Sequence, residues 1–289
     1  ICAVFVSGFT FIKNAIKLDY PIAEAIKSVL PLVDEMVVAV GNGEDETRDL
    51  VKSLSSKIKI IDTIWDEKLR EGGEVLAAET DKAFSEINPI SNWCIYIQGD
   101  ECIHEKYYNE IRQQMKAFKD NPSVDGLLFD YVHFYGSYDY VGDSRTWYRK
   151  EIRVIKNNAE IKSWKDAQGF RSKLNTKIKA TLIPARVFHY GWARQEQIMN
   201  KKVQKFEKLY HGEEFQNQQF NYERIWGLKE FKETHPKMMN NWIEKNRNSL
   251  DIMSLPIRND WRNLGLFLSD TLENLTGYRI GEYKNYIKI

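Results

Sequence analysis

The chain has 289 residues, enough for one large domain or two modest ones with a substantial core. Its 42 Lys and Arg residues nearly balance its 41 Asp and Glu residues, giving a formal net charge of +1. No global field therefore draws it onto nucleic acid or an anionic bilayer, and a charged partner must be met locally. The three cysteines have no repeated spacing, which excludes a disulfide framework or zinc ribbon and favours a reducing compartment. No stretch reaches the roughly eighteen apolar residues of a membrane span, so we expect a soluble chain.

The first hundred residues alternate between strand-like and helix-like segments. The expected strands are 3–6, 36–40, 57–61 and 93–97, and the expected helices are 22–30, 45–55 and 73–86. This alternation predicts the α/β class, with a parallel sheet covered by helices on both faces. Ligands of such sheets bind beyond the carboxyl ends of the strands, so we expect the polar groups there to converge on one cleft.

The second part of the chain changes character twice. Further strands are expected at 126–134, 152–156 and 181–188, and polar helices follow after about residue 195. Between the first two of these strands lies a loop rich in aromatic residues, from Tyr135 to Lys150. Its rings either fill the core or form a platform that stacks on sugar faces, and we expect some of them to be exposed.

Two carboxylates, Asp100 and Glu101, directly follow the apolar strand at 93–97. At that position a carboxylate can hold a divalent cation between the protein and a diphosphate, because hard cations prefer oxygen ligands. The alternative is that Asp100 caps the helix beginning near Glu105 and that Glu101 is solvated.

Several fragments around this acidic pair stand in a fixed order. They are Lys13-Asn14, Val33-Asp34-Glu35 before an apolar strand, Asp45-Glu46-Thr47, and a strand leading into Gln98-Gly99-Asp100-Glu101. As an ordered set they resemble the inverting nucleotide-sugar glycosyltransferases of family 2, over residues 3–105 and more loosely over 126–192.

The resemblance implies a GT-A-type fold, which is a mixed, mainly parallel sheet flanked by helices. Residues 1–195 would form the catalytic domain, with a nucleotide-sugar half at about 1–105 and an acceptor half at about 106–195. Residues 196–289 would form a helical C-terminal extension.

The resemblance also implies which residues bind the donor. Asp100 would hold a divalent metal, Mn or Mg, and the donor would be a nucleotide-diphosphate sugar. The other residues implied to contact the donor are Ser7, Gly8 and Phe9 around the nucleoside, Asp45 close to them, and Arg70, Gly73, Gln98 and Gly99 along the sugar-nucleotide.

Two positions depart from the family pattern. Gln98 replaces the first acid of the D-x-D motif, so the cation would lose one charged ligand and metal dependence is open. Val40 stands where an acid usually reads the base, so the identity of the nucleotide is open too.

Three later residues complete the implied site. Asp166 is the candidate base that removes the proton of the acceptor hydroxyl, or else a loop Asp that pairs with Lys165 or Arg171. His189 would reach the metal or the diphosphate, or else act as a structural hydrogen-bonding residue. Arg194 could neutralise the leaving diphosphate.

The chain lacks the motifs of three other enzyme classes: G-x-G-x-x-G of dinucleotide oxidoreductases, G-K-[ST] of P-loop kinases and G-x-S-x-G of serine hydrolases. The resemblance to family 2 then implies a cytoplasmic glycosyltransferase with a saccharide or lipid-linked acceptor, acting in polysaccharide or glycan biosynthesis. The C-terminal helices would cover the acceptor side, pair two subunits or contact the inner face of the membrane. The alternative is a catalytically silent domain of the same fold that binds a sugar or nucleotide.

Overall fold

The structure is a computed structural model that describes residues 4–66, 68–69, 71–211, 219–247, 250–258 and 260–289. Its N-terminal part is a parallel sheet in the order β4-β1-β2-β3. The bounds of these strands are Val6–Ile12 for β1, Glu35–Gly41 for β2, Ile58–Thr63 for β3 and Trp93–Tyr96 for β4. The helices between them are α1 (Ile22–Val29), α2 (Thr47–Ser53) and α3 (Glu74–Ser85).

Later strands extend this sheet from β4. β8 (Lys150–Lys156) pairs antiparallel with β4, and β6 (Gly126–Tyr135) pairs antiparallel with β8. The long strand β11 (Lys179–Trp192) lies parallel to β6 and antiparallel to β5 (Glu101–Ile103). The remaining strands are β7 (Tyr140–Gly142), β12 (Leu228–Glu230), β13 (Ile287–Lys288) and the hairpin β9 (Ile161–Trp164) and β10 (Gly169–Ser172). The predicted α/β class, a mixed sheet flanked by helices, is confirmed.

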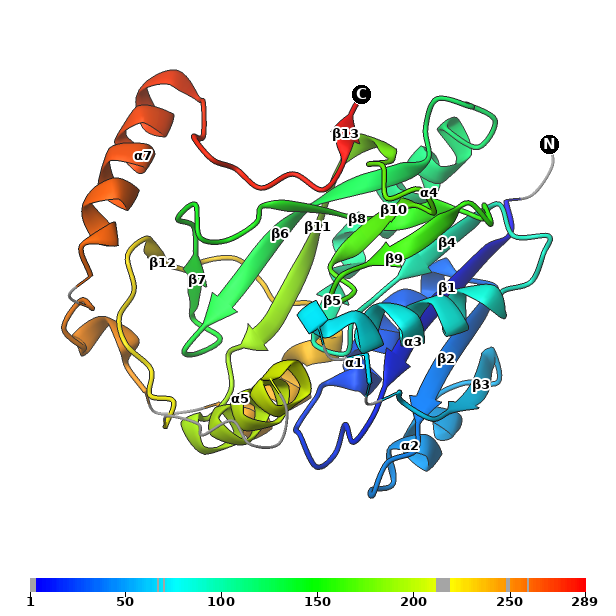
Figure 1. Cartoon of the computed structure of the whole chain (residues 1–289), viewed down its shortest axis with the longest axis horizontal. Coiled ribbons are helices and arrows are strands. Elements are labelled where there is room, and N and C mark those ends of the chain that lie inside the picture. The colour runs from blue at the N-terminus through cyan, green and yellow to red at the C-terminus, as the bar shows by residue number, and fades with distance from the viewer. Residues whose placement is uncertain (1–3, 67, 70, 212–218, 248–249, 259) are drawn as a thin grey trace.

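Helices lie on both sides of the sheet (Figure 1), and two clusters of apolar side chains pack against its faces. On one face α1 and α2 lie over alternate residues of β1 and β2, and α4 (Tyr108–Ala117) packs against β11. On the other face α3 and the β9–β10 hairpin enclose Phe9, Tyr96 and Phe170, whose ring centroids lie 5.3 to 5.9 Å apart. The hairpin that carries Asp166 is therefore anchored to the same core as the strands of the donor half.

The C-terminal part contains the helices α5 (Glu196–His211), α6 (Asn240–Asn246) and α7 (Arg262–Thr276), together with strands and irregular segments. Short 3-10 helices occur at Leu30–Leu32, Glu71–Gly73, Glu105–Tyr107, Lys237–Met239 and Ile252–Ser254. The chain then returns to the sheet, where β13 pairs with β11, so the domain division at residue 195 stays a prediction. Within the described ranges, no helix has the length and apolar character to cross a bilayer.

Two expectations about local structure are wrong. β1 runs on to Ile12 instead of ending at Val6, because small polar residues inside it are satisfied within the core: Ser7 hydrogen-bonds Glu35 and Ser91. The aromatic residues from 131 to 148 include no exposed ring, because those on β6 and in the following loop pack against β11 and the C-terminal segment. Four of these rings, Tyr131, Tyr140, Trp147 and Tyr148, are half-buried.

Candidate functional site

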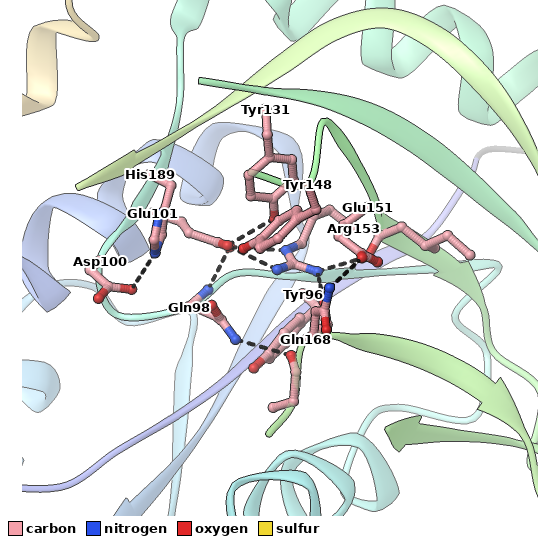
Figure 2. A network of polar contacts seen from close by, with 12 residues as sticks. Tyr96, Gln98, Asp100, Glu101, Tyr131, Tyr148, Glu151, Arg153, Gln168 and His189 are labelled. Atoms are coloured by element: carbon pink, nitrogen blue, oxygen red, sulfur yellow. Dashed lines mark hydrogen bonds and ion pairs between the residues drawn. The ribbon is translucent and has the colours of Figure 1, made fainter. Parts of the chain in front are cut away.

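The site forms where β4 ends and the chain turns into β5. β5 pairs with β11 in a register that sets Glu101 opposite His189. The backbone N–H of Tyr190 donates to the Asp100 carbonyl at 2.8 Å, which fixes the acidic loop against β11. Asp100 and His189, 89 positions apart in sequence, thus lie side by side, with 3.8 Å between Oδ1 and Nε2 (Figure 2).

Asp100 is buried among cationic groups. Its Oδ2 lies 3.1 Å from Lys202 Nζ and 3.4 Å from an Arg194 Nη atom. Burial opposes ionisation, but Lys202, His189 and Arg194 together hold the pKa of Asp100 well below its usual range. Asp100 is therefore an ion-paired carboxylate, and the predicted helix-capping role does not apply to it.

The two cations are themselves held in place. Arg194 donates to the Leu18 carbonyl at 2.6 Å and stacks 4.1 Å from the ring centroid of Tyr20. Lys202, on α5, donates to the Gly191 carbonyl at 2.9 Å. Burial and the nearby Arg194 lower the pKa of Lys202 to about 8, so it remains largely protonated at pH 7.

A second histidine orients His189. His133 Nε2 lies 2.7 Å from the Tyr148 carbonyl, which only accepts, so this nitrogen carries the hydrogen. Burial lowers the pKa of His133 well below its usual value, so its Nδ1 is a bare acceptor for the His189 Nδ1–H at 3.0 Å. In a neutral His189, the Nε2 that faces Asp100 therefore presents a lone pair.

These residues do not fit the divalent cation that the resemblance implied. Asp100 and His189 are together as predicted, but two cationic groups already occupy Asp100 Oδ2. Nowhere in the described ranges do three His, Cys, Asp or Glu side chains gather as a metal site would need. Gln98 supplies no further charge.

Glu101 is buried for a different purpose. Its carboxylate receives both Nε and Nη2 of Arg153 at 2.9 Å, the Tyr131 hydroxyl at 2.8 Å and the backbone N–H of Gln98 at 3.1 Å. Figure 2 shows how Arg153 faces Glu101, and both side chains are fully buried. The expectation of a solvated Glu101 is wrong, because β5 carries it into the sheet opposite β11.

The same network holds the turn that carries Asp166. Gln98 Nε2 donates to the Ala167 carbonyl at 3.0 Å, and Arg153 Nη1 donates to the Gln168 carbonyl at 2.7 Å. Lys165 and Ala167, on either side of Asp166, have φ angles of 54° and 62°, so the turn is a tight one. Burial raises the pKa of Asp166 above its usual value, which strengthens it as a base.

Other residues implied to bind the donor lie elsewhere. Ser7, Gly8 and Phe9 are inside β1 and buried, so they cannot line a nucleoside pocket; a Cβ on Gly8 would lie 2.4 Å from the Met36 sulfur. Asp45 accepts from Thr47 and from the Lys17 backbone, which ties α2 to the loop after β1.

The glycines and Arg70 complete the predicted set. Gly99 packs against Ile12: a Cβ added to Gly99 would lie 3.1 Å from the Ile12 Cδ1 atom. Gly73 precedes α3 with a φ of 77°, in the 3-10 turn that contacts α5. Arg70 lies outside the described residues.

Sequence reasoning missed Lys202, Arg153 and His133. Lys202 is 102 positions from Asp100, on a helix that carries several other lysines, and no spacing links the two. Arg153 carried a partial signal, because it stands between Ile152 and Val154 on a strand whose middle is apolar, and a charge buried there needs a partner.

In sequence the chain is glycosyltransferase-like. It is 22% identical over 231 residues to an uncharacterized glycosyltransferase of Rickettsia typhi, a match that covers 76% of this chain and 74% of the relative. No protein-family profile matches the chain.

Similarities to solved structures are weaker. One is S. aureus TarS 1–349, with 12% sequence identity, coverage of 74% of this chain and 67% of that chain, and a TM-score of 0.38. Another is the complex of S. aureus TarS 1–349 with UDP-GlcNAc, with 20% identity, coverage of 46% of this chain and 36% of that chain, and a TM-score of 0.34. A third is glucosyl-3-phosphoglycerate synthase of Mycobacterium tuberculosis in complex with Mn2+, UDP and phosphoglyceric acid. It has 14% sequence identity, coverage of 45% of this chain and 44% of that chain, and a TM-score of 0.31. The chain spans only 36% of the UDP-GlcNAc-bound chain. Because these TM-scores are low, the description of the fold rests on the strand order and register given above.

Proposed function

We propose that this chain is an inverting glycosyltransferase that moves a sugar from a nucleotide-diphosphate donor to a saccharide or lipid-linked acceptor. The carrying observation is the hydrogen bond from Gln98, in the acidic loop after β4, to Ala167, beside the candidate base Asp166. It joins a donor-side loop and an acceptor-side turn at one place. The proposed setting is polysaccharide or glycan assembly at the cytoplasmic side of the membrane.

The donor half has the properties that a nucleotide diphosphate requires. The Gln98–Glu101 loop follows β4, at the carboxyl end of parallel strands, where ligands of such sheets bind. Arg194 lies next to that loop, and a guanidinium matches phosphate oxygens with two parallel donors. The likeness in sequence to a protein named as a glycosyltransferase supports the same class.

The proposed reaction is a single in-line displacement. Asp166 removes the proton from the acceptor hydroxyl as its oxygen forms a bond to the anomeric carbon. The bond between that carbon and the diphosphate oxygen breaks on the opposite side, and the nucleoside diphosphate leaves with the electron pair. Positive groups near the leaving oxygens stabilise the charge that develops there.

The donor site is tested by thermal unfolding in the presence of UDP, GDP, CDP or dTDP, each with and without Mn2+. A ligand at about 100 times its Kd stabilises the native state by about 2.7 kcal/mol, which is readily measured as a rise in Tm. We expect one nucleotide to raise Tm clearly above the others. The absence of any rise with all four would reject the donor site.

The base is tested with Asp166→Asn, which keeps the size of the side chain and removes its basicity. We expect kcat for transfer or donor hydrolysis to fall by about 100-fold or more while the nucleotide still raises Tm. Asp49→Asn, on the exposed side of α2, is the matched control and should leave kcat unchanged. Nucleotide binding without turnover in the unmodified protein would indicate a silent binding domain instead.

A further inference from the structure

We propose that Lys202 and Arg194 are the built-in cations that neutralise the donor diphosphate, so that this chain transfers sugar without a divalent metal. The inference rests on the proposed function and replaces the metal that the sequence resemblance implied at Asp100. It assigns a binding role to Lys202, a residue from the C-terminal helix α5.

The first support is how Lys202 is held. Its Nζ contacts the Asp100 carboxylate at 3.1 Å and the Gly191 carbonyl at 2.9 Å, and lies 5.4 Å from the ring centroid of Tyr20. A carboxylate, a carbonyl and an aromatic face are the groups that surround a bound cation. The ammonium thus has a built site beside the acid to which the family resemblance assigns the metal.

The second support is the balance of charge. Asp100 contributes one negative charge, whereas the Lys202 and Arg194 groups in contact with it contribute two positive charges, an excess of one. Asp19 also acts on Arg194, but burial raises the pKa of Asp19, which favours its neutral form. Gln98 adds none, and burial lowers the pKa of His189, which favours its neutral ring. A divalent cation would have to enter against two cations, whereas a diphosphate would meet a positive site.

The third support is access. His189 and the Asp100 carboxylate crowd Gly191, where a Cβ would lie 2.6 Å from His189 Nε2 and 3.0 Å from Asp100 Oδ2. Gly191 therefore lets its backbone approach the cluster closely and present its carbonyl to Lys202. Lys202 itself keeps 12% of its side chain exposed, whereas Arg194 keeps 4%, so Lys202 is the cation more open to a ligand.

A purely structural role for Lys202, joining α5 to the acidic loop, makes a different prediction. Removing the lysine would then lower the free energy of unfolding but leave the nucleotide affinity of the folded protein unchanged. The experiment therefore measures affinity on folded protein, and Lys202→Arg tests whether a cation alone restores it.

The experiment is calorimetric titration with UDP, and with GDP, CDP and dTDP in parallel, in EDTA and in Mn2+. We expect the Kd of the unmodified protein to differ by less than about twofold between the two buffers. Lys202→Met should weaken binding about tenfold or more, and Lys202→Arg should recover most of the loss, because one charge-assisted contact is removed and then returned. The neighbouring exposed lysine supplies the matched control, and Lys201→Gln should bind as the unmodified protein does.

Two results would overturn the inference while leaving the proposed function standing. One is binding that EDTA abolishes and Mn2+ restores. The other is a folded Lys202→Met protein with unchanged affinity. Should Lys202→Met not fold, the EDTA comparison on the unmodified protein still decides. Failure of all four nucleotides to bind would instead reject the donor site itself.

Discussion

The buried pair of Glu101 and Arg153, which joins the predicted donor half to β8, should be highly sensitive to mutation. Arg153→Met keeps most of the side-chain volume but leaves a carboxylate that is 0% exposed without its cation. Breaking a buried pair in this way costs about 3–5 kcal/mol. The Gln168 carbonyl also loses its donor at 2.7 Å, which adds about 1 kcal/mol or more. A total of at least about 4 kcal/mol is a large share of the 5–15 kcal/mol typical of a folded protein.

The assay is urea unfolding followed by tryptophan fluorescence, with a double-mutant cycle. Glu101→Gln combined with Arg153→Met removes the stranded charge and keeps one acceptor oxygen for the Tyr131 hydroxyl. The double variant should therefore be more stable than Arg153→Met alone by about 2 kcal/mol or more. A matched control is Arg48→Met, which breaks the exposed pair with Asp62 and should hardly move the urea midpoint.

The reasoning would be refuted by either of two results. Arg153→Met could cost less than about 1 kcal/mol, which would mean that water or rearrangement screens Glu101. The double variant could be no more stable than Arg153→Met alone. The loss of stability would then come from the packing of Arg153 against the rings of Tyr96 and Tyr131, and not from charge; each ring centroid lies 5.2 Å from the guanidinium carbon.

Two further predictions concern the same network. Burial raises the pKa of Glu151 to about 8, so the folded protein keeps this group protonated and loses stability as pH rises from about 5 to 8, by up to about 1.4 kcal/mol per pH unit. Glu151→Gln should match the unmodified protein near pH 5 and exceed its stability increasingly up to pH 8; parallel urea midpoints across that range would contradict this. Gln98→Met removes the donor to Ala167 without adding charge, and should lower kcat about fivefold while leaving nucleotide Kd unchanged. An equal loss in both quantities would show that Gln98 acts on the donor instead.

Much of the fold could be predicted from the sequence because its signals are local. The helix at 22–29 ends next to Pro31, and the strands at 35–41 and 93–96 are apolar runs of strand length. β1 was misjudged for an equally local reason. Ser7 and Thr10 read as the polar end of a strand, and only the tertiary partners Glu35 and Ser91 show how a buried serine is satisfied.

The candidate site was predictable only in part. Asp100 and His189 each follow an apolar run, and the sheet brings them together as expected. Lys202 could not be found, because its position depends on how α5 packs after β11 rather than on a spacing. The environment of Glu101 also depends on distant pairing, since Arg153 and Tyr131 lie 52 and 30 positions away.

Gln98 illustrates how a departure from a family pattern changes meaning once contacts are known. In sequence it is a lost acid and therefore a weakened metal site. In the fold its amide donates to the Ala167 carbonyl, which a carboxylate cannot do, because an ionised acid only accepts hydrogen bonds. Next to it, Lys202 and Arg194 outweigh the single charge of Asp100, and an amide at position 98 keeps the positive excess that a second acid would cancel. The loss of the acid and the presence of the two cations thus have one physical explanation, in which the charge of the donor site is supplied by the chain itself.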